Sequence, residues 1–578
     1  MFASNSDASA ASSSYDAQRE WRLLRQLTLL VLVLSCAWAM ALNLVDPDLW
    51  GHVRYAEDWL ATGVLPRTAS HTYSAAAHPW VNHENLAELC FALGYRYLGI
   101  TGLLIAKCLA GLAILFAMVW NARKNGVKLL VAWTLMLLIA AALHPFFFLR
   151  PQLLSFALCS LMLVLLETGF CDWQNQKAVR WWPLLLLIPV FVIWANTHGA
   201  FVAGLGIATV YLLGRVIELI ALRQSPDAKD CRKASIKVLL SLMAIILGIC
   251  AATFVNPYGF ELHRWLARSL SQPRPEITEW AAPRLGNPAF WPWVVLLSAT
   301  GLSLLLTRQR RDWVRLVILV LVAWQSALHM RHIPFFALLC GFWMPNHYQS
   351  AIGKIQFRLP QVPWLRQVAV IALLACLANL SFSIDRRVSH LPVARNDYPL
   401  DAVQYMVDRG LRGKLVVSFN WAQYAVASLS PAVQVGFDGR FRTCYPQEVI
   451  DMHFDFQLGE FGGSRNRSPN SGPIDATRVL TFGEPDLVLL DRHYSSAVET
   501  MQDCSDWVLL FRDRVAEIWG RRLRYDDPHS ADYLPLALRV QDPRPRTGSL
   551  QWPALPVRDQ GARFAGQNVG NDEQPVEM

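Results

Sequence analysis

The sequence has 578 residues, of which 53% are hydrophobic and 17% are charged, whereas soluble proteins average about 25% charged residues. Its net charge of +9 does not indicate a nucleic-acid partner, because most Lys and Arg lie in short connections between apolar blocks, where membrane topology explains them. The 11 Cys have no CxxC or CxxH spacing, which argues against a zinc or haem site.

Residues 1–20 are polar and rich in Ser and Ala, which predicts a disordered cytoplasmic N-terminus. The apolar blocks that follow are long enough to cross a hydrocarbon core about 30 Å thick. They predict about eleven transmembrane helices, near residues 24–44, 92–119, 127–144, 152–167, 182–196, 200–221, 236–254, 291–307, 313–328, 333–346 and 367–384. We therefore expect a polytopic α-helical membrane domain over residues 21–385, with a large first outer loop over residues 45–91.

The basic residues indicate the orientation of these helices, because cytoplasmic loops are enriched in Lys and Arg. With the N-terminus in the cytoplasm, the basic clusters fall in alternate loops, for example at Arg123 and Lys124 and at Arg310 and Arg311. An odd number of crossings then places the C-terminal domain outside the cytoplasm. The expected location is the inner (plasma) membrane, with the lipid bilayer as a partner.

Residues 390–525 alternate short apolar strands with helical segments, which predicts a small α/β periplasmic domain. Strands are expected at residues 414–419, 433–437 and 485–491, helices at 421–429 and 445–456, and a hairpin or strand pair at 507–519. Residues 526–578 are rich in Pro, Arg, Asp and Gln, which predicts a disordered tail. Cys444 and Cys504 share the domain and could pair in an oxidising compartment.

The first outer loop opens with two carboxylates, Asp46 and Asp48, followed by His52 and Arg54. A carboxylate held near apolar surface has a raised proton affinity and can act as a general base. Alternatively, Asp46 caps a helix that starts at Asp48. Farther along the loop, His83 and Glu84 could orient a substrate or satisfy backbone groups.

The other outer turns also carry polar residues with useful chemistry. They contain Arg150 and Gln152, Asn196 and His198, Asn256 and Tyr258, Glu279, and Arg331 and His332. All are predicted on the face that carries Asp46 and Asp48, and ionisable groups at membrane depth usually mark a function. We therefore expect one site at this face, with guanidinium groups binding a phosphate or pyrophosphate.

Two further features leave alternatives open. The two neighbouring Asp could hold a divalent ion through oxygen ligands, although no complete ligand set is visible. In the C-terminal domain, Asp438-Gly439-Arg440 predicts a turn with Gly in a left-handed conformation, or a contact with an acceptor or partner.

The order of these motifs resembles that of bacterial membrane glycosyltransferases of the GT-C type, the polyprenyl-phosphate-sugar-dependent mannosyl- and arabinosyltransferase-like proteins. The resemblance covers residues 20–520 and rests on Asp46-Pro47-Asp48-Leu49-Trp50, His83-Glu84, Arg150-Pro151-Gln152, Asn196-Thr197-His198-Gly199, Asn256-Pro257-Tyr258-Gly259, Arg331-His332-Ile333-Pro334, Asn420-Trp421-Ala422-Gln423-Tyr424 and Phe437-Asp438-Gly439-Arg440. The sequence departs from the pattern at Gly51 and Asn85, where an aromatic residue is usual.

The resemblance implies transfer of a sugar from a lipid-linked donor to an extracytoplasmic acceptor, with inversion at the anomeric carbon. Asp46 and Asp48 match the acidic position that serves as base, or as metal ligand in some branches. Arg150, Arg331 and His332 would stabilise the departing lipid phosphate. The substrate-binding set would also include His52, Arg54, His83, Glu84, Gln152, Asn196, His198, Asn256 and Tyr258.

Two other classes of function compete with a transferase. The first is a non-catalytic membrane protein that binds a lipid-linked saccharide within an envelope assembly complex. The second is a transporter, which fits less well because the polar groups lie at helix ends on one side and no repeat is visible. The sequence indicates no oligomeric state.

Overall fold

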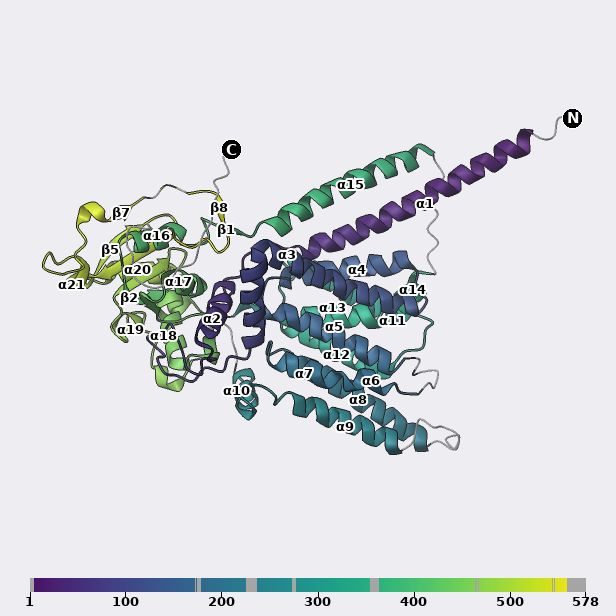
Figure 1. The fold of residues 1–578 in the computed structure, drawn as a ribbon, viewed down its shortest axis with the longest axis horizontal. Coiled ribbons are helices and arrows are strands. Elements are labelled where there is room, and N and C mark those ends of the chain that lie inside the picture. The colour runs from purple at the N-terminus through teal and green to yellow at the C-terminus, as the bar shows by residue number, and fades with distance from the viewer. Residues whose placement is uncertain are drawn as a thin grey trace.

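The computed structural model describes residues 5–171, 173, 178–224, 236–272, 277–353, 363–462, 465, 467–542, 544 and 546–558. It consists of a helical bundle and a C-terminal α/β domain that covers one end of the bundle (Figure 1).

The bundle is formed by the long apolar segments of the sequence. Its helices are α1 (Asn5–Met40), α3 (Asn85–Lys124), α4 (Leu129–Leu143), α5 (Pro151–Gly169), α6 (Trp181–Leu185), α7 (Leu187–Ala195), α8 (Phe201–Gln224), α9 (Ile236–Ala252), α11 (Trp291–Leu306), α12 (Trp313–Leu328), α13 (Ile333–Trp343), α14 (Pro345–Ile352) and α15 (Pro363–Ser389). In the part of the chain that the structure describes, 7 helices are long and apolar enough to cross a membrane, and the α6–α7 pair, α9 and α12 are shorter apolar helices. The chain is a multi-pass membrane protein.

Every predicted helix range overlaps a helix of the structure, but the number of crossings stays a prediction. The helix α13 has 11 residues, all of them buried, and at about 1.5 Å per residue it is too short to cross the hydrocarbon core alone.

The N-terminal helix α1 begins at Asn5, so disorder over residues 1–20 is contradicted from residue 5 onward. Ala has the highest helix propensity, and the Ala-rich segment extends the helix. The helices α1 and α15 lie side by side along one flank (Figure 1).

Short elements connect the helices at the end nearest the C-terminal domain. They are α2 (Leu49–Thr62), η1 (His144–Phe146), α10 (Phe260–Leu270), η5 (Thr278–Trp280), η6 (Pro288–Phe290) and η7 (Met330–His332). The predicted outer turns therefore lie at the same end of the bundle, as the sequence indicates.

The C-terminal domain has the predicted α/β architecture. Its strands are β1 (Pro392–Ala394), β2 (Gly413–Val417), β3 (Val433–Val435), β4 (Leu487–Asp491), β5 (Trp507–Arg512), β6 (Ala516–Arg521), β7 (Val540–Gln541) and β8 (Ser549–Gln551). Its helices are α16 (Leu400–Asp408), η8 (Phe419–Trp421), α17 (Ala422–Leu429), η9 (Phe441–Thr443), α18 (Gln447–Leu458), η10 (Gly459–Gly462), η11 (Pro469–Ser471), α19 (Arg478–Thr481), α20 (Ser495–Asp503), α21 (Arg522–Tyr525) and η12 (Leu536–Leu538).

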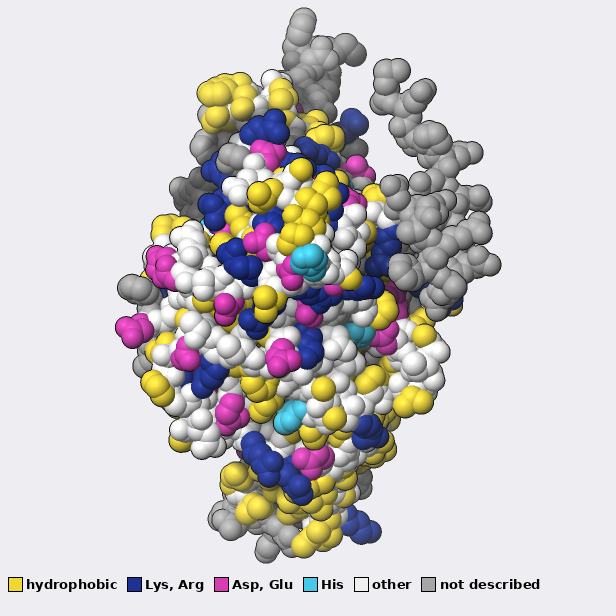
Figure 2. Space-filling view, turned by 90° about the vertical axis from the view of Figure 1, so that its left-hand side faces the viewer, with side chains coloured by type: hydrophobic (Ala, Val, Ile, Leu, Met, Phe, Trp, Pro, Cys, Tyr) yellow, Lys and Arg dark blue, Asp and Glu magenta, His cyan; other side chains and the backbone are white. Residues whose placement is uncertain are grey.

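Six of these strands form one sheet in the order β3-β2-β4-β6-β5-β7. The strand β2 pairs in parallel with β3 and β4, whereas β6 runs antiparallel to both β4 and β5. Figure 2 looks onto the domain end of the molecule, where basic and acidic side chains are interspersed as on a water-exposed surface.

The predicted disordered tail is wrong for residues 526–558. Strand β8 pairs antiparallel with β1, and Trp552 is buried against Trp50 and Tyr95, with ring centroids 6.2 and 4.8 Å apart. The partner of β8 lies far back in the sequence, so local composition does not reveal the pairing. Residues 559–578 lie outside the described residues.

The second hydrophobic core joins the C-terminal domain to the first outer loop. Leu49, Trp50 and Val53 of α2 pack in the same cluster as Trp421 and Tyr424 of the domain. The domain is therefore packed on the segment that carries Asp46 and Asp48. Cys444 and Cys504 are both free thiols, so the suggested pairing is not formed.

Candidate active site

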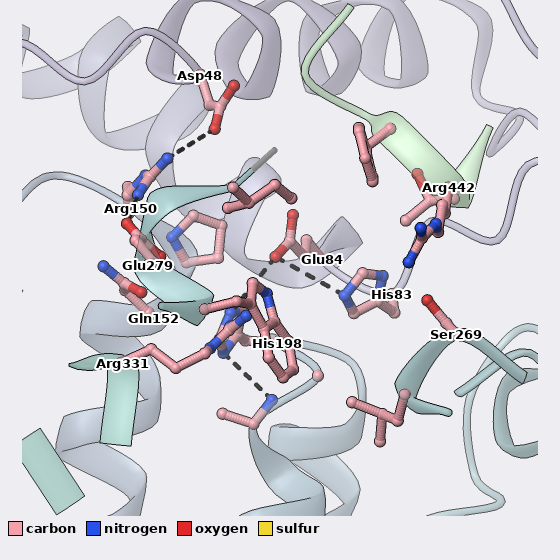
Figure 3. Close-up of a pocket in the computed structure, with 18 of the residues that line it drawn as sticks. Asp48, His83, Glu84, Arg150, Gln152, His198, Ser269, Glu279, Arg331 and Arg442 are labelled. Carbon is pink, nitrogen blue, oxygen red and sulfur yellow. Dashed lines mark hydrogen bonds and ion pairs between the residues drawn. The ribbon is translucent and has the colours of Figure 1, made fainter. Parts of the chain in front are cut away.

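A cavity of about 1020 Å³ lies between the bundle and the C-terminal domain. The predicted site residues that line it are Asp48, His52, His83, Glu84, Arg150, Gln152, His198, Arg331 and His332 (Figure 3). They come from the start of α2, the segment before α3, the start of α5, the turn before α8 and η7, so segments far apart in the sequence meet in one place.

One side of the cavity is a cluster of three carboxylates around Arg150. Arg150 Nε lies 2.5 Å from Asp46 Oδ2 and Arg150 Nη2 lies 2.9 Å from Asp48 Oδ2. Arg150 Nη1 pairs with Glu279. All three sides of the guanidinium thus face carboxylates, and their negative charges exceed its positive charge.

Asp46 is buried behind Asp48 and does not line the cavity. Its Oδ1 accepts a hydrogen bond of 2.9 Å from the backbone N–H of Asp48, immediately before α2. Both carboxylate oxygens of Asp46 therefore have a partner: Oδ1 accepts the N–H of Asp48 and Oδ2 pairs with Arg150. The helix begins at Leu49 with Asp48 as its N-cap residue, so Asp46 supports the turn before the helix rather than capping it as predicted.

Burial is the main influence on the pKa values in this cluster. It raises the pKa of Asp46 to about 6, and the charge of Asp48 acts in the same direction, against the opposing effect of Arg150. Burial disfavours the charged form of Arg150, but Asp46, Glu279 and Asp48 outweigh it and raise the pKa of Arg150.

The carboxylate cluster does not fit a divalent ion, because Arg150 occupies its centre. Within the described ranges, no group of three His, Cys, Asp or Glu side chains could hold a metal ion.

Arg331 lies on another side of the cavity with a different environment. Its guanidinium carbon is 4.4 Å from the ring centroid of Trp280, and no described carboxylate lies within ion-pair distance of it. Nearby, the buried Nε2 of Gln152 and Nδ1 of His332 have no hydrogen-bond partner in the part of the chain that the structure describes. Burial lowers the pKa of Arg331, and burial followed by the charge of Arg331 lowers the pKa of His332 to about 4.

His198 and Glu84 lie near the middle of the cavity, with His198 close to Arg331 (Figure 3). His198 Nδ1 accepts a hydrogen bond from Ala200 N at 3.3 Å and lies 3.0 Å from Ser155 Oγ. Its Nε2 lies 3.7 Å from Glu84 Oε1. Burial, and then the charge of Arg331, hold the pKa of His198 well below its usual value, so a neutral imidazole faces the cavity.

His52 is held by Glu88, a residue that the sequence interpretation did not assign. His52 Nδ1 lies 3.3 Å from Glu88 Oε1, and Asn82 donates a 2.6 Å hydrogen bond to Glu88 Oε2. Burial opposes the charged imidazole, but the hydrogen bond from His52 to Glu88 and the neighbouring carboxylates raise the pKa of His52 to about 9.

The cavity continues as an apolar groove between α8 and α12. It is lined by Val202, Ala203, Gly206, Ile207 and Val210 of α8 and by Ile318, Leu321 and Val322 of α12. Val210 is 37% exposed and Leu321 is 45% exposed, so the groove opens on the outside of the bundle. A groove in helices that cross a membrane suits a hydrocarbon chain.

The C-terminal domain forms the remaining wall, with Phe419, Asn420, Gln423, Phe454, Gln457 and Tyr494. The domain approaches α2 closely at two glycines. A Cβ on Gly51 would lie 2.1 Å from Gln423 Oε1, and one on Gly439 would lie 2.2 Å from Asp48 Oδ1. The departure from the family pattern at Gly51 thus makes room for Gln423.

The segment Asp438-Gly439-Arg440 is a turn, but Gly439 is not among the glycines with positive φ, so the left-handed prediction is wrong. Arg440 Nη2 lies 2.7 Å from Asp438 Oδ2, and its guanidinium carbon lies 4.6 Å from the Tyr55 ring centroid. The close approach of Asp48, rather than backbone conformation, explains the glycine.

Comparisons with known proteins gave no matching family model and no matching curated protein. Among solved structures, the chain is similar to ArnT from Cupriavidus metallidurans bound to undecaprenyl phosphate, with a TM-score of 0.48, 11% identity, and 89% of this chain and 98% of that chain covered. It is also similar to the arabinofuranosyltransferase AftD from Mycobacteria, with a TM-score of 0.44, 16% identity, and 86% of this chain and 40% of that chain covered. A third similar structure is the Archaeoglobus fulgidus oligosaccharyltransferase in complex with Zn and sulfate, with a TM-score of 0.40, 11% identity, and 82% of this chain and 69% of that chain covered.

At these identities and TM-scores, the likeness is one of fold.

Four predicted substrate-binding residues do not line the cavity. Arg54 pairs with Asp58 at 3.1 Å on another face of α2. It follows the cavity-lining His52 by two residues, and two residues along a helix turn the side chain by about 200°. Asn196 donates to the carbonyls of Val192 and Val255. Asn256 Oδ1 accepts from the N–H of Tyr258 at 2.8 Å, and the Tyr258 ring packs on Arg67 at 4.9 Å.

These contacts show that Asn196 and the Asn256–Tyr258 motif shape turns. Conversely, the sequence interpretation assigned no site role to Glu88 and Gln423, and it placed Glu279 on this face without naming it as a site residue. Glu88 follows Glu84 by four residues, a spacing that places both on one helix face, and this signal would have revealed it. Glu279 and Gln423 reach the cavity only through the tertiary fold.

Proposed function

We propose that the protein is a membrane glycosyltransferase that moves a sugar from a polyprenyl-phosphate-linked donor to an acceptor outside the cytoplasm, with inversion at the anomeric carbon. The observation behind it is that one cavity joins a carboxylate-lined side, a half-buried arginine with no carboxylate partner among the described residues, and an apolar groove that opens between membrane helices. These are the three environments that a lipid-phosphate sugar needs.

The donor phosphate would lie at Arg331. Its guanidinium faces no carboxylate among the described residues, and the buried Nε2 of Gln152 needs an acceptor. A guanidinium binds phosphate oxygens in a bidentate fork. Because Arg150 is neutralised by three carboxylates, Arg331 favours a singly charged monophosphate diester over a pyrophosphate. The polyprenyl chain would follow the groove between α8 and α12.

Asp48 is the best-placed general base. Its Oδ2 is held by Arg150, and the residue lines the cavity. In the proposed reaction, Asp48 takes the proton of an acceptor hydroxyl while that oxygen bonds to the anomeric carbon. The bond from the anomeric carbon to the phosphate oxygen breaks, and its electron pair leaves with the lipid phosphate, which Arg331 stabilises. Asp46 would act as a positioning residue.

The placement outside the cytoplasm is supported by the basic residues. The turn between α11 and α12, with Arg308, Arg310 and Arg311, lies at the bundle end away from the cavity (Figure 1). By the positive-inside rule, that end belongs in the cytoplasm. The C-terminal domain and the cavity would then face the periplasm or cell exterior.

A non-catalytic protein that binds lipid-linked saccharide remains the second candidate. The observation that favours it is that Asp46 and Asp48 are both already paired with Arg150, as in a structural ion-pair cluster.

Asp48→Asn distinguishes the two functions. A general base contributes about 10²- to 10⁴-fold to a rate, so a transferase should lose turnover by this factor and keep donor binding. Asp385→Asn, which changes an exposed carboxylate on α15, is the matched control. Unchanged turnover in Asp48→Asn would contradict the assigned base. A wild-type protein that binds donor but transfers no sugar would support the binding protein.

A further inference from the structure

Lys107 is a buried cation in the membrane-spanning helix α3. It is 2% exposed, and no carboxylate among the described residues pairs with it. A charged side chain at membrane depth is costly and is kept for a specific purpose. The cavity does not include Lys107, so substrate contact does not explain it.

The hydrogen bonds of Lys107 reach the two loops that build the carboxylate cluster. Its Nζ donates to the carbonyl of Leu42, four residues before Asp46, and to the carbonyl of Phe147 at 3.1 Å, three residues before Arg150. One ammonium group therefore ties together the loop that carries the acids and the loop that carries their arginine.

The face of α3 around Lys107 is shaped for this contact. One helical turn on, a Cβ on Gly111 would lie 2.7 Å from Met40 and 2.8 Å from Phe147. The end of α1 is held in a similar way, since His144 donates to the carbonyl of Ala39 at 2.7 Å and Arg387 to that of Trp38 at 3.3 Å. Cationic groups and hydrogen-bond donors stabilise the last carbonyls of a helix.

We propose that Lys107 is a positioning residue that sets the Asp46–Asp48 loop against the Arg150 loop. The effect of Lys107 on catalysis rests on the proposed function, whereas its role in tethering the two loops does not. The catalytic effect and the tethering are therefore measured separately.

Hydrogen–deuterium exchange of the full-length protein in lipid nanodiscs tests the tether. Lys107→Met is expected to speed exchange at the N–H groups of Asp48 and Arg150 by about tenfold, the effect of losing one hydrogen bond to a charged group. Lys107→Arg should restore slow exchange, and Lys124→Met at the exposed end of the same helix should change neither loop. If Lys107→Met fails to insert, Lys107→Gln, a shorter neutral donor, replaces it.

Unchanged exchange in both loops, or faster exchange along the whole bundle, would overturn the proposal. Activity supplies the second measurement. A positioning role predicts a lower kcat with an unchanged KM for donor, and recovery in Lys107→Arg. If Lys107→Met loosens the two loops but the wild-type protein transfers no sugar, the transferase function is refuted while the tethering role of Lys107 still holds.

Discussion

Arg150 is the residue on which the charges of the site depend. Its guanidinium joins two consecutive acids of the first outer loop to Glu279, which lies 129 residues farther on. An arginine with three carboxylates is poorly suited to bind a phosphate as well. Of the two arginines to which the motifs assign the phosphate, we therefore propose that Arg331, rather than Arg150, binds it.

The raised pKa of Asp46 predicts a pH dependence. Burial raises this pKa to about 6, so Asp46 is ionised and pairs with Arg150 above that value, and it becomes protonated below it. Activity should therefore fall by about tenfold per pH unit on the acid side of 6. The measurement is kcat/KM between pH 5 and 8. In Asp46→Asn, kcat/KM should be lower at neutral pH but should no longer fall below pH 6. If kcat/KM of this variant still fell as in the wild type, another group would be responsible for the titration.

At the residue scale, sequence patterns identified many of the polar residues that line the cavity but not the role of each. Polar residues at apolar block ends gave Asp48, His83, Arg150, His198 and Arg331, because membrane burial makes such residues conspicuous. The same patterns could not distinguish Asn196 and Asn256 from the residues that line the cavity, since an amide that shapes a turn and one that binds a ligand look alike in sequence.

At the scale of elements, the packing of α2 against the C-terminal domain sets the position of Asp48. The two surfaces meet at Gly51 and Gly439, where a Cβ would overlap Gln423 and Asp48. The base would thus be held partly by a domain that lies almost 400 residues away in the chain.

Gly439→Ala tests this contact. The added methyl group must displace the Asp48 carboxylate or the backbone around residue 439, and a shift of about 1 Å in a reacting group costs about 100-fold in rate. We expect such a loss in kcat with little change in thermal stability. Gly286→Ala, where no atom lies within 4 Å of the new Cβ, is the control. Equal activity in both variants would argue against Asp48 as the base.

The elements that the sequence predicted well are those with a local signal. The long apolar runs predicted the helices, and alternating short strands predicted the α/β domain. Strand β8 was missed because its partner β1 lies far away in the sequence. The extension of α1 to Asn5 was missed because polar, Ser-rich composition indicates disorder even where Ala residues favour helix.

At the scale of the whole molecule, bundle and domain form one functional unit. The bundle supplies the apolar groove and Arg331, and the domain supplies the opposite wall with Phe419, Asn420 and Tyr494. A lipid chain can enter from the bilayer, while an acceptor can approach from the aqueous side past the domain. This arrangement fits the proposed transferase, whose lipid-linked donor and acceptor would differ in solubility.

The most direct test is native mass spectrometry of the full chain with polyprenyl phosphate, the product expected after transfer. The wild-type protein should bind one molecule, and polyprenol of equal length should not compete. Arg331→Met should weaken binding by about 10- to 100-fold, the effect of losing a hydrogen bond to a charged group, while Arg308→Met at the other end of the bundle should not. Equal binding of the alcohol and the phosphate, or undiminished binding by Arg331→Met, would contradict a lipid-phosphate site in this cavity.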